Sequence, residues 1–253
     1  MTRFRKWLSI LFLATCIVLL ASCADKDDRF KHMSETELYH GGVKALDKHD
    51  YQDAIAHFEA QEAQFSYGQY ARPEQIIIIY AYYMNDDYPS SLSAAQRYIH
   101  LYPQGENVDY AYYMQALSAY AEARTFLENY FPVDLAERDL AAPQQAYNYF
   151  NEFLSRFPSS VYAPDARQHM IYIRNAIARN NLKVAQYYYS RKAYVGALNR
   201  ARAVVFNFQE TPSVPDALVV MFNCYQRLNL PQDAQDVRAV LARNYPDKLQ
   251  SIK

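Results

Sequence analysis

A pattern that returns five times along the chain is the feature that most constrains the fold. Each copy has a small residue near its start, an apolar helical face, and an aromatic residue just before a turn-forming residue. A small residue lets two helices approach closely, and a proline after the aromatic residue cannot continue a helix. The five copies cover residues 51–66, 88–103, 146–158, 194–209 and 234–246. The pattern therefore predicts five helical hairpins stacked along the chain.

The spacing of the copies identifies the type of repeat. Their final residues lie 37, 55, 51 and 37 positions apart, and a tetratricopeptide repeat has about 34 residues. Apolar positions at helical spacing precede the copies, for example Leu38, Gly42 and Ala45 before the first. We therefore predict an all-α fold, a tetratricopeptide (TPR)-like superhelical array of about five helix-turn-helix repeats.

The two longer intervals predict insertions. Residues 129–139 are expected to form a loop between the two helices of the third unit, and a further helix is expected from about Pro164 to Arg179. The apolar run Ile76 to Ile79 alone would suit a buried strand. Because Tyr83 and Met84 continue an apolar helical face, we predict a helix there too. Glycine supports this fold class, since only five glycines are present and all-β domains need many glycine turns.

The N-terminus reads as an export signal. Three basic residues precede an apolar stretch over residues 7–20, which is short for a membrane span. The segment Leu20-Ala21-Ser22-Cys23, followed by charged residues, resembles the bacterial lipobox. It predicts a signal peptide over 1–22 that is removed, N-acyl and S-diacylglycerol groups on Cys23, and a lipidated linker over 23–33. The resemblance to sorted lipoproteins implies transport to the outer membrane, because Ala24, and not aspartate, follows the cysteine. The alternative is a plain signal peptide with a chance cysteine.

Charge and cysteine content narrow the functional classes. Without its signal the chain has 23 basic and 27 acidic residues, a net charge of −4 before histidine, which argues against nucleic acid as a partner. With Cys16 removed and Cys23 acylated, Cys224 has no partner for an intramolecular disulfide. A small buried residue on a helix is the expected role of Cys224.

Motifs that carry catalysis or metal binding are missing from the sequence. The six histidines form no pair at zinc-binding spacing, and no phosphate-binding loop or nucleophile elbow is present. We therefore expect no enzyme activity, no metal site and no cofactor besides the covalent lipid.

Tyrosine is unusually frequent, with 25 residues, all beyond the signal. Tyrosine rings with a polar edge suit a groove that holds an extended peptide. The first helices of such arrays line the concave side, which predicts a peptide-binding groove with Tyr39, Tyr80, Tyr83, Tyr113 and Tyr120. The alternative is that these tyrosines pack between helices.

A second candidate surface is a cationic cluster in the fourth unit, with Arg191, Lys192, Arg200 and Arg202. The guanidinium group of arginine can donate two parallel hydrogen bonds to a carboxylate, so such a cluster suits an acidic surface of a partner protein. The alternative is a solvated helix face.

Three segments, together with the lipobox, suggest a family. They are Tyr80-Ala81-Tyr82-Tyr83, the run from Val108 to Met114, and Phe131-Pro132-Val133-Asp134 with Arg138-Asp139. The chain resembles the BamD family, lipoproteins of the outer-membrane β-barrel assembly (BAM) complex, over essentially its whole length.

The resemblance implies a scaffold at the periplasmic face of the outer membrane, held there by its lipid. It implies that C-terminal repeats 4–5, over 161–253, bind the POTRA domains of BamA, with BamC and BamE as further partners. It also implies that N-terminal repeats 1–3, over 34–160, receive the C-terminal signal of unfolded β-barrel substrates. Two alternatives remain: a TPR lipoprotein adaptor of cell-wall or envelope-constriction machinery, and a lipoprotein that binds peptidoglycan.

Overall fold

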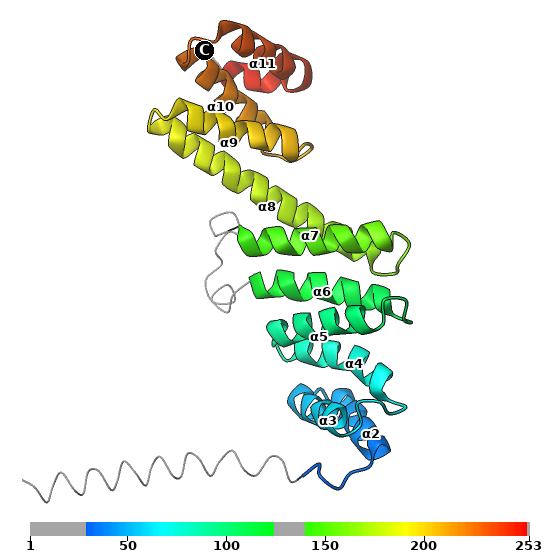
Figure 1. The fold of residues 1–253 in the computed structure, drawn as a ribbon. Helices are drawn as coiled ribbons and strands as arrows, with labels where there is room; N and C mark the ends of the chain where they lie inside the picture. Colours follow the sequence, from blue (N-terminus) through cyan, green and yellow to red (C-terminus); the bar gives the residue numbers. More distant parts are fainter. Residues whose placement is uncertain (1–28, 124–139, 252–253) are drawn as a thin grey trace, which may run out of the picture. The chain divides into compact units, whose positions relative to one another are not determined.

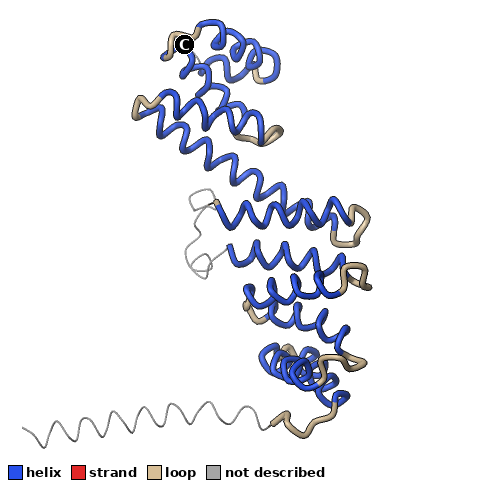
Figure 2. The backbone as a smooth tube through the Cα atoms, viewed as in Figure 1, coloured by secondary structure: helices blue, strands red, loops and turns tan. Residues whose placement is uncertain are grey.

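The computed structural model describes residues 29–123 and 140–251, and within these ranges it has helices and connecting turns but no strand (Figure 2). The α-helices are α2 (Glu35–Asp47), α3 (Tyr51–Gln64), α4 (Ala71–Met84), α5 (Tyr88–Leu101), α6 (Val108–Ala123), α7 (Ala141–Arg156), α8 (Ala163–Ser190), α9 (Tyr194–Asn207), α10 (Val214–Arg227) and α11 (Pro231–Asn244), followed by the 3-10 helix η3 (Pro246–Ser251). This confirms the predicted all-α fold. The signal peptide, Cys23 and the insertion over 129–139 lie outside the described residues.

The helices form two compact units. In the first, which ends at Asp87, α3 packs against both α2 and α4. In the second, which begins at Tyr88, each helix from α5 to α11 packs against the next one in chain order (Figure 1). The expected grouping of repeats into 34–160 and 161–253 stays a prediction.

Four of the turns between successive helices have the same backbone geometry. His49, Asp86, Lys192 and Asn229 are the middle residues of the turns α2–α3, α4–α5, α8–α9 and α10–α11, and each has a positive φ near 60°. In every turn the following residue donates its N–H to the carbonyl five positions back, as Asp50 does to Ala45 at 3.0 Å. The interval is 37 positions from His49 to Asp86 and again from Lys192 to Asn229. The turns therefore repeat at the same 37-residue interval as two of the sequence copies.

The aromatic residues that close the five copies end the second helices. Each donates its N–H to the carbonyl four positions back and accepts from the N–H three positions ahead. These residues are Phe65, Tyr102, Phe157, Phe208 and Tyr245, after α3, α5, α7, α9 and α11. The predicted helix before each of these five residues is thereby confirmed, and the predicted helix over Ile76 to Ile79 lies within α4.

The small residues near the start of the second helices are buried. Ala54, Ala146 and Ala197 are fully buried on α3, α7 and α9. On α5 the equivalent residue is Ser91, which accepts a buried hydrogen bond from Ser118 of α6 at 2.8 Å. The small residues that the sequence pattern singled out therefore lie in the interior of both units.

Helix α8 corrects one prediction. The expected separate helix over 164–179 is continuous with the first helix of the fourth unit, and together they form one helix of 28 residues. No proline or glycine interrupts Asp165 to Ser190, and the Asn181 amide donates to the Ile177 carbonyl inside the helix at 3.0 Å. One part of α8 packs on α7 and another on α9 and α10, so tertiary contacts support its full length.

The segment before α2 is fixed to the first unit by an aromatic residue. Phe30 is buried and meets the His57 ring edge-on, with centroids 4.8 Å apart. Its carbonyl accepts from Gln64 at 3.3 Å, and Arg29 pairs with Asp53. The described chain is therefore attached to α3 before the first helix begins at its Ser34 cap.

Candidate binding surfaces

Two of the predicted groove tyrosines lie in the first unit beside other tyrosines. Tyr39 on α2 stacks on Tyr70, with centroids 4.4 Å apart and ring planes inclined by 13°. Burial raises the pKa of the Tyr39 hydroxyl, with a smaller contribution from Tyr70. Tyr80 on α4 meets the edge of Tyr51 at 6.4 Å and is 40 % exposed. Tyr80 therefore offers an accessible ring, whereas Tyr39 is engaged in packing.

Tyr83, also on α4, is half-buried. It lies three residues after Tyr80, so the two side chains share one side of the helix. Of the groove tyrosines predicted in the first unit, Tyr80 and Tyr83 are therefore the two that lie on the same side of α4.

The tyrosines predicted on α6 pack against α8. Tyr113 stacks on Tyr162, at the start of α8, with centroids 4.9 Å apart, and donates to Asp165 at 2.7 Å. Tyr120 is 8 % exposed and lies 4.8 Å from the His169 ring. Tyr120 therefore lies between helices and does not present an open face, which is the packing role that the sequence left as the alternative.

The stacks formed by Tyr39 and Tyr113 connect equivalent positions of successive repeats. Each joins the first helix of a repeat to the tyrosine that directly precedes the first helix of the next repeat, Tyr70 before α4 and Tyr162 before α8. Sequence reasoning missed Tyr70 and Tyr162. The sequence did contain a pattern that could have identified them, because each lies directly before the alanine that begins the first helix of a repeat.

Two of the predicted cationic residues, Arg200 and Arg202, have different neighbours. Arg200 on α9 turns toward α8, where it donates to the Asn181 oxygen at 3.1 Å. Arg202 lies over the Phe206 ring, 5.6 Å from its centroid. Two positions along a helix differ by about 200° in direction, so these arginines leave α9 on different sides.

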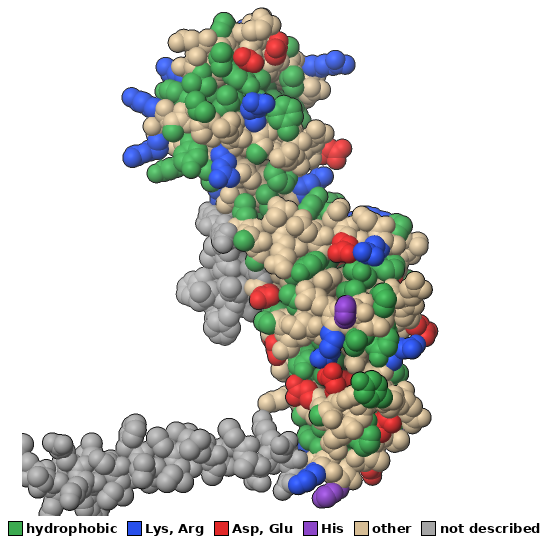
Figure 3. All heavy atoms as spheres, viewed as in Figure 1, with side chains coloured by type: hydrophobic (Ala, Val, Ile, Leu, Met, Phe, Trp, Pro, Cys, Tyr) green, Lys and Arg blue, Asp and Glu red, His purple; other side chains and the backbone are tan. Residues whose placement is uncertain are grey.

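The other two cationic residues lie in the α8–α9 turn. Both Arg191 and Lys192 are exposed, and Lys192 has the left-handed backbone of this turn. In the view of Figure 3, Lys and Arg side chains project from several sides of the region formed by α8 to α11, with apolar patches between them. The positive charge of this region is therefore distributed.

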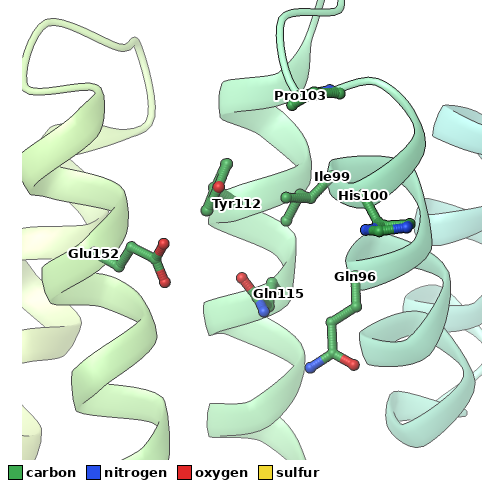
Figure 4. Close-up of a pocket in the computed structure, with 7 residues that line it drawn as sticks. All are labelled: Gln96, Ile99, His100, Pro103, Tyr112, Gln115 and Glu152. Carbon is green, nitrogen blue, oxygen red and sulfur yellow. The ribbon is translucent and has the colours of Figure 1, made fainter.

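The second unit also has two open hollows beside α6. One, of about 440 Å³, lies between α5, α6 and α7 (Figure 4). The other, of about 490 Å³, lies where the α5–α6 and α7–α8 turns meet. The sequence analysis missed both, and the only local signal was Gln115, a polar residue within the otherwise apolar segment Ala111 to Leu117.

Three further features of the described residues concern metal binding, membrane spans and the remaining cysteine. Within 29–123 and 140–251, no three His, Cys, Asp or Glu side chains are placed to hold a metal ion, and no helix has the length and apolar character of a membrane span. Cys224 is fully buried, and burial raises the pKa of its thiol to about 11. This placement confirms the expected role of Cys224 as a small buried residue.

Comparison with known proteins gives a consistent result. Residues 31–241 match the family model described as YfiO, outer membrane lipoprotein. A protein of Neisseria meningitidis serogroup A, named outer membrane protein assembly factor BamD, is 35% identical over 243 residues, 94% of this chain and 91% of the relative. Proteins with the same name from Pasteurella multocida and Vibrio cholerae are 31% and 30% identical, over 95% and 89% of this chain and 92% and 94% of the relatives.

The match covers all five helix pairs apart from the end of the last helix, and the similarity to these relatives extends over nearly the full length of both proteins. The predicted resemblance is thereby confirmed. The chain belongs to the YfiO family of outer membrane lipoproteins, which includes the BamD assembly factors.

Proposed function

We propose that this protein is a periplasmic scaffold of the BAM complex, needed for the assembly and insertion of β-barrel proteins into the outer membrane. Lipid on Cys23 holds it at the membrane, and its helical array faces the periplasm. Family membership carries this proposal, because the relatives bear the name of outer membrane protein assembly factors. An array of stacked hairpins supports it, since such arrays provide extended surfaces for other proteins.

BamA is the proposed partner of the C-terminal repeats, through its POTRA domains, with BamC and BamE as further partners. Arg200 is the side chain we place in the BamA contact. It is exposed, and its hydrogen bond to Asn181 holds the guanidinium in a defined position. A guanidinium has five N–H donors, so one bond to Asn181 leaves donors for a carboxylate of BamA.

Unfolded β-barrel proteins are the proposed substrates of the N-terminal repeats. Tyr80 and Tyr83 are the two groove residues that offer the most to such a peptide, since they share a side of α4. Tyr39, Tyr113 and Tyr120 give the surrounding helices their packing through the contacts described above. Aromatic rings with a polar edge suit a peptide that carries both apolar and polar side chains.

An affinity pulldown of the native lipoprotein from solubilised outer membranes tests the proposal. We expect recovery of a POTRA-containing barrel protein, reduced by Arg200→Glu and little changed by Arg202→Glu, the matched control on another side of α9. If the two variants recovered the barrel protein equally well, the assembly role would stand, but Arg200 would not be part of the contact. Recovery of cell-wall or envelope-constriction proteins without a barrel protein would favour the adaptor function instead.

A further inference from the structure

One end of the first unit presents an aromatic side chain that the packing of the fold does not use. Tyr67, in the turn between α3 and α4, is fully exposed, with a relative exposure of 101 %. A ring left wholly in water gains no free energy from burial in the fold. Tyrosine is one of the two residue types that are enriched at the interface between a membrane and water, where its ring and hydroxyl meet different surroundings.

The turn that carries Tyr67 is held in place by the beginning of α2. The Glu35 carboxylate accepts the N–H of Tyr70 at 2.8 Å, and a Cβ atom on Gly68 would overlap this carboxylate. The Gly68 N–H also donates to the Phe65 carbonyl at 2.9 Å. Contacts on both sides of Tyr67 fix its backbone, so the exposed ring projects from a defined turn.

The same turn lies beside the segment that leads back to the proposed lipid site. Gln64, which ends α3 three residues before Tyr67, donates to the Phe30 carbonyl at 3.3 Å. Phe30 is buried and packs on His57. The segment before α2 is therefore fixed at the end of the unit that carries Tyr67.

The distance between this end and the membrane has an upper limit, which rests on the lipid attachment proposed above. Cys23 lies six residues before Arg29, and six residues of fully extended chain span at most about 20 Å. With the lipid in the membrane, Arg29 stays within this distance of the headgroups. A short tether gives an effective concentration of about millimolar, so even a weak contact between this end and the membrane is populated.

The charges at this end are compatible with a layer of phospholipid headgroups. The Glu35 carboxylate accepts from the turn backbone, and Asp53 pairs with Arg29. Lys31 and His32 are exposed on the same segment, and a lysine beside an anionic membrane contributes about 1 kcal/mol. Because the adjoining residues 24–28 are acidic overall, the ring of the turn, and not the net charge, carries the contact.

We propose that Tyr67 and residues 29–33 contact the phospholipid surface, with the Tyr67 ring at the level of the headgroups. A lipid on a linker leaves the attached domain free to rotate. A second contact at Tyr67 limits this rotation and sets the orientation of the first unit relative to the membrane. The proposal concerns a different surface from the tyrosines of α4 and does not depend on which proteins bind the array.

Tryptophan fluorescence of tethered protein tests the contact. The one tryptophan of the chain, Trp7, lies in the predicted signal, so Tyr67→Trp gives the mature chain a single fluorophore. Coupling Cys23 to a maleimide lipid supplies the anchor chemically, because Cys224 is buried. The probe is a vesicle of phosphatidylethanolamine and phosphatidylglycerol with brominated acyl chains, which quench tryptophan at short range. We expect loss of about half of the emission, since interfacial side chains lie about 5–10 Å into the headgroup boundary.

Tyr80→Trp is the matched control in the same unit. Tyr80 is 40 % exposed and meets Tyr51, which begins α3 at the end opposite Gln64. A helix of 14 residues is about 20 Å long, so we expect brominated lipid to leave Tyr80→Trp unchanged. Equal quenching of the two variants, or none in Tyr67→Trp, would overturn the proposal. Because the maleimide supplies the anchor, this result is independent of whether cells acylate Cys23.

A partition experiment measures the contribution of the ring without a fluorophore at its position. A single acyl chain gives reversible membrane binding with an association constant of about 10⁴ M⁻¹, so protein coupled at Cys23 to one such chain distributes between vesicles and water. We expect Tyr67→Ser to lower the bound fraction several-fold at an unchanged melting temperature. Tyr187→Ser, at a 60 % exposed tyrosine of α8, should partition as the wild type does. Wild-type partition of Tyr67→Ser would reject the contact.

Discussion

Tyr113 stacks on Tyr162 with ring centroids 4.9 Å apart and ring planes inclined by 11°. This stack joins α6 to the start of α8, and Tyr39 and Tyr70 form its counterpart in the first unit. The two stacks show that part of the high tyrosine content serves contacts between repeats. It follows that tyrosine exposure, and not tyrosine number, indicates where a peptide could bind.

Removing one ring of this stack should destabilise the second unit. We expect Tyr162→Ala to lower the free energy of unfolding by about 2 kcal/mol, since it removes both a half-buried ring and a stacked aromatic contact. Tyr162→Phe keeps the ring and should stay close to the wild type. Urea unfolding followed by circular dichroism measures both, and equal losses in the two variants would show that the stack contributes nothing.

Substitution of glycine by alanine should have opposite effects on stability at two positions, Gly42 and Gly196. A Cβ atom on Gly42 would lie 2.5 Å from Phe58, which is fully buried, so we expect Gly42→Ala to destabilise the protein by about 1–3 kcal/mol. On Gly196 the nearest atom would be Tyr188 Cδ2 at 3.2 Å, at the limit that a small shift accommodates. Alanine also favours a helix over glycine by about 1 kcal/mol.

Thermal unfolding of these two variants is a direct comparison. Gly42→Ala should lower the melting temperature, and Gly196→Ala should leave it unchanged or raise it. A fall of similar size in both variants would contradict our inference that α2 and α3 approach each other more closely at Gly42 than α8 and α9 do at Gly196.

The segment before α2 should depend on Phe30. Phe30→Ala removes the ring that packs on His57, so we expect faster amide hydrogen exchange in residues 29–33 and cleavage there in limited proteolysis. Arg29→Ala serves as a control, because the exposed ion pair of Arg29 with Asp53 is worth at most about 1 kcal/mol. If Arg29→Ala released the segment as fully as Phe30→Ala, aromatic packing would not be its main attachment.

Cys224 should be inert toward thiol reagents in the folded protein. Burial raises the pKa of its thiol to about 11, so at pH 8 almost none is in the reactive thiolate form. In a Cys23→Ser background we expect slow labelling by iodoacetamide at pH 8 and fast labelling after unfolding in urea. Rapid labelling of the native protein would mean that α10 opens readily around this residue.

The raised pKa of Cys224 also has a consequence for stability. A thiol whose pKa is higher in the folded state than in the unfolded state stabilises the fold fully below the unfolded value, near 9, and loses this contribution as the pH rises toward 11. The difference in melting temperature between the wild type and Cys224→Ala should therefore shrink between pH 9 and pH 11. A difference that stayed constant over this range would contradict the shift.

Membrane attachment should depend on Cys23. We expect Cys23→Ser to move the protein from the membrane fraction to the soluble periplasmic fraction, because each buried methylene of an acyl chain contributes about 0.8 kcal/mol to binding. Cys16→Ser, in the predicted signal, is the matched control and should leave the distribution unchanged. Cell fractionation with immunoblotting measures both, and a Cys23→Ser protein that stayed with the membrane would exclude the lipid as its main anchor.

The repeat was predictable because its determinants are local. The aromatic residues that close the five copies, such as Phe65 and Phe157, end their helices through hydrogen bonds to residues three and four positions away. The family likewise followed from local segments. Proline and glycine positions, apolar spacing and capping residues all act within one or two helical turns, so the sequence determined the helix pairs and their order.

The continuity of α8 and the surroundings of the predicted site residues depended on distant contacts. Residues 164–179 and 184–190 each have an apolar face, and only packing on α7, α9 and α10 shows that they form one helix. Arg200 and Arg202 are neighbours in the sequence, but α9 directs them to different sides. Whether Tyr120 is buried is decided by its contact with His169 of α8, which the local sequence does not specify. The sequence by itself determined the array and its family, and the tertiary structure decided which side chains remain available, because burial is a property of neighbouring helices.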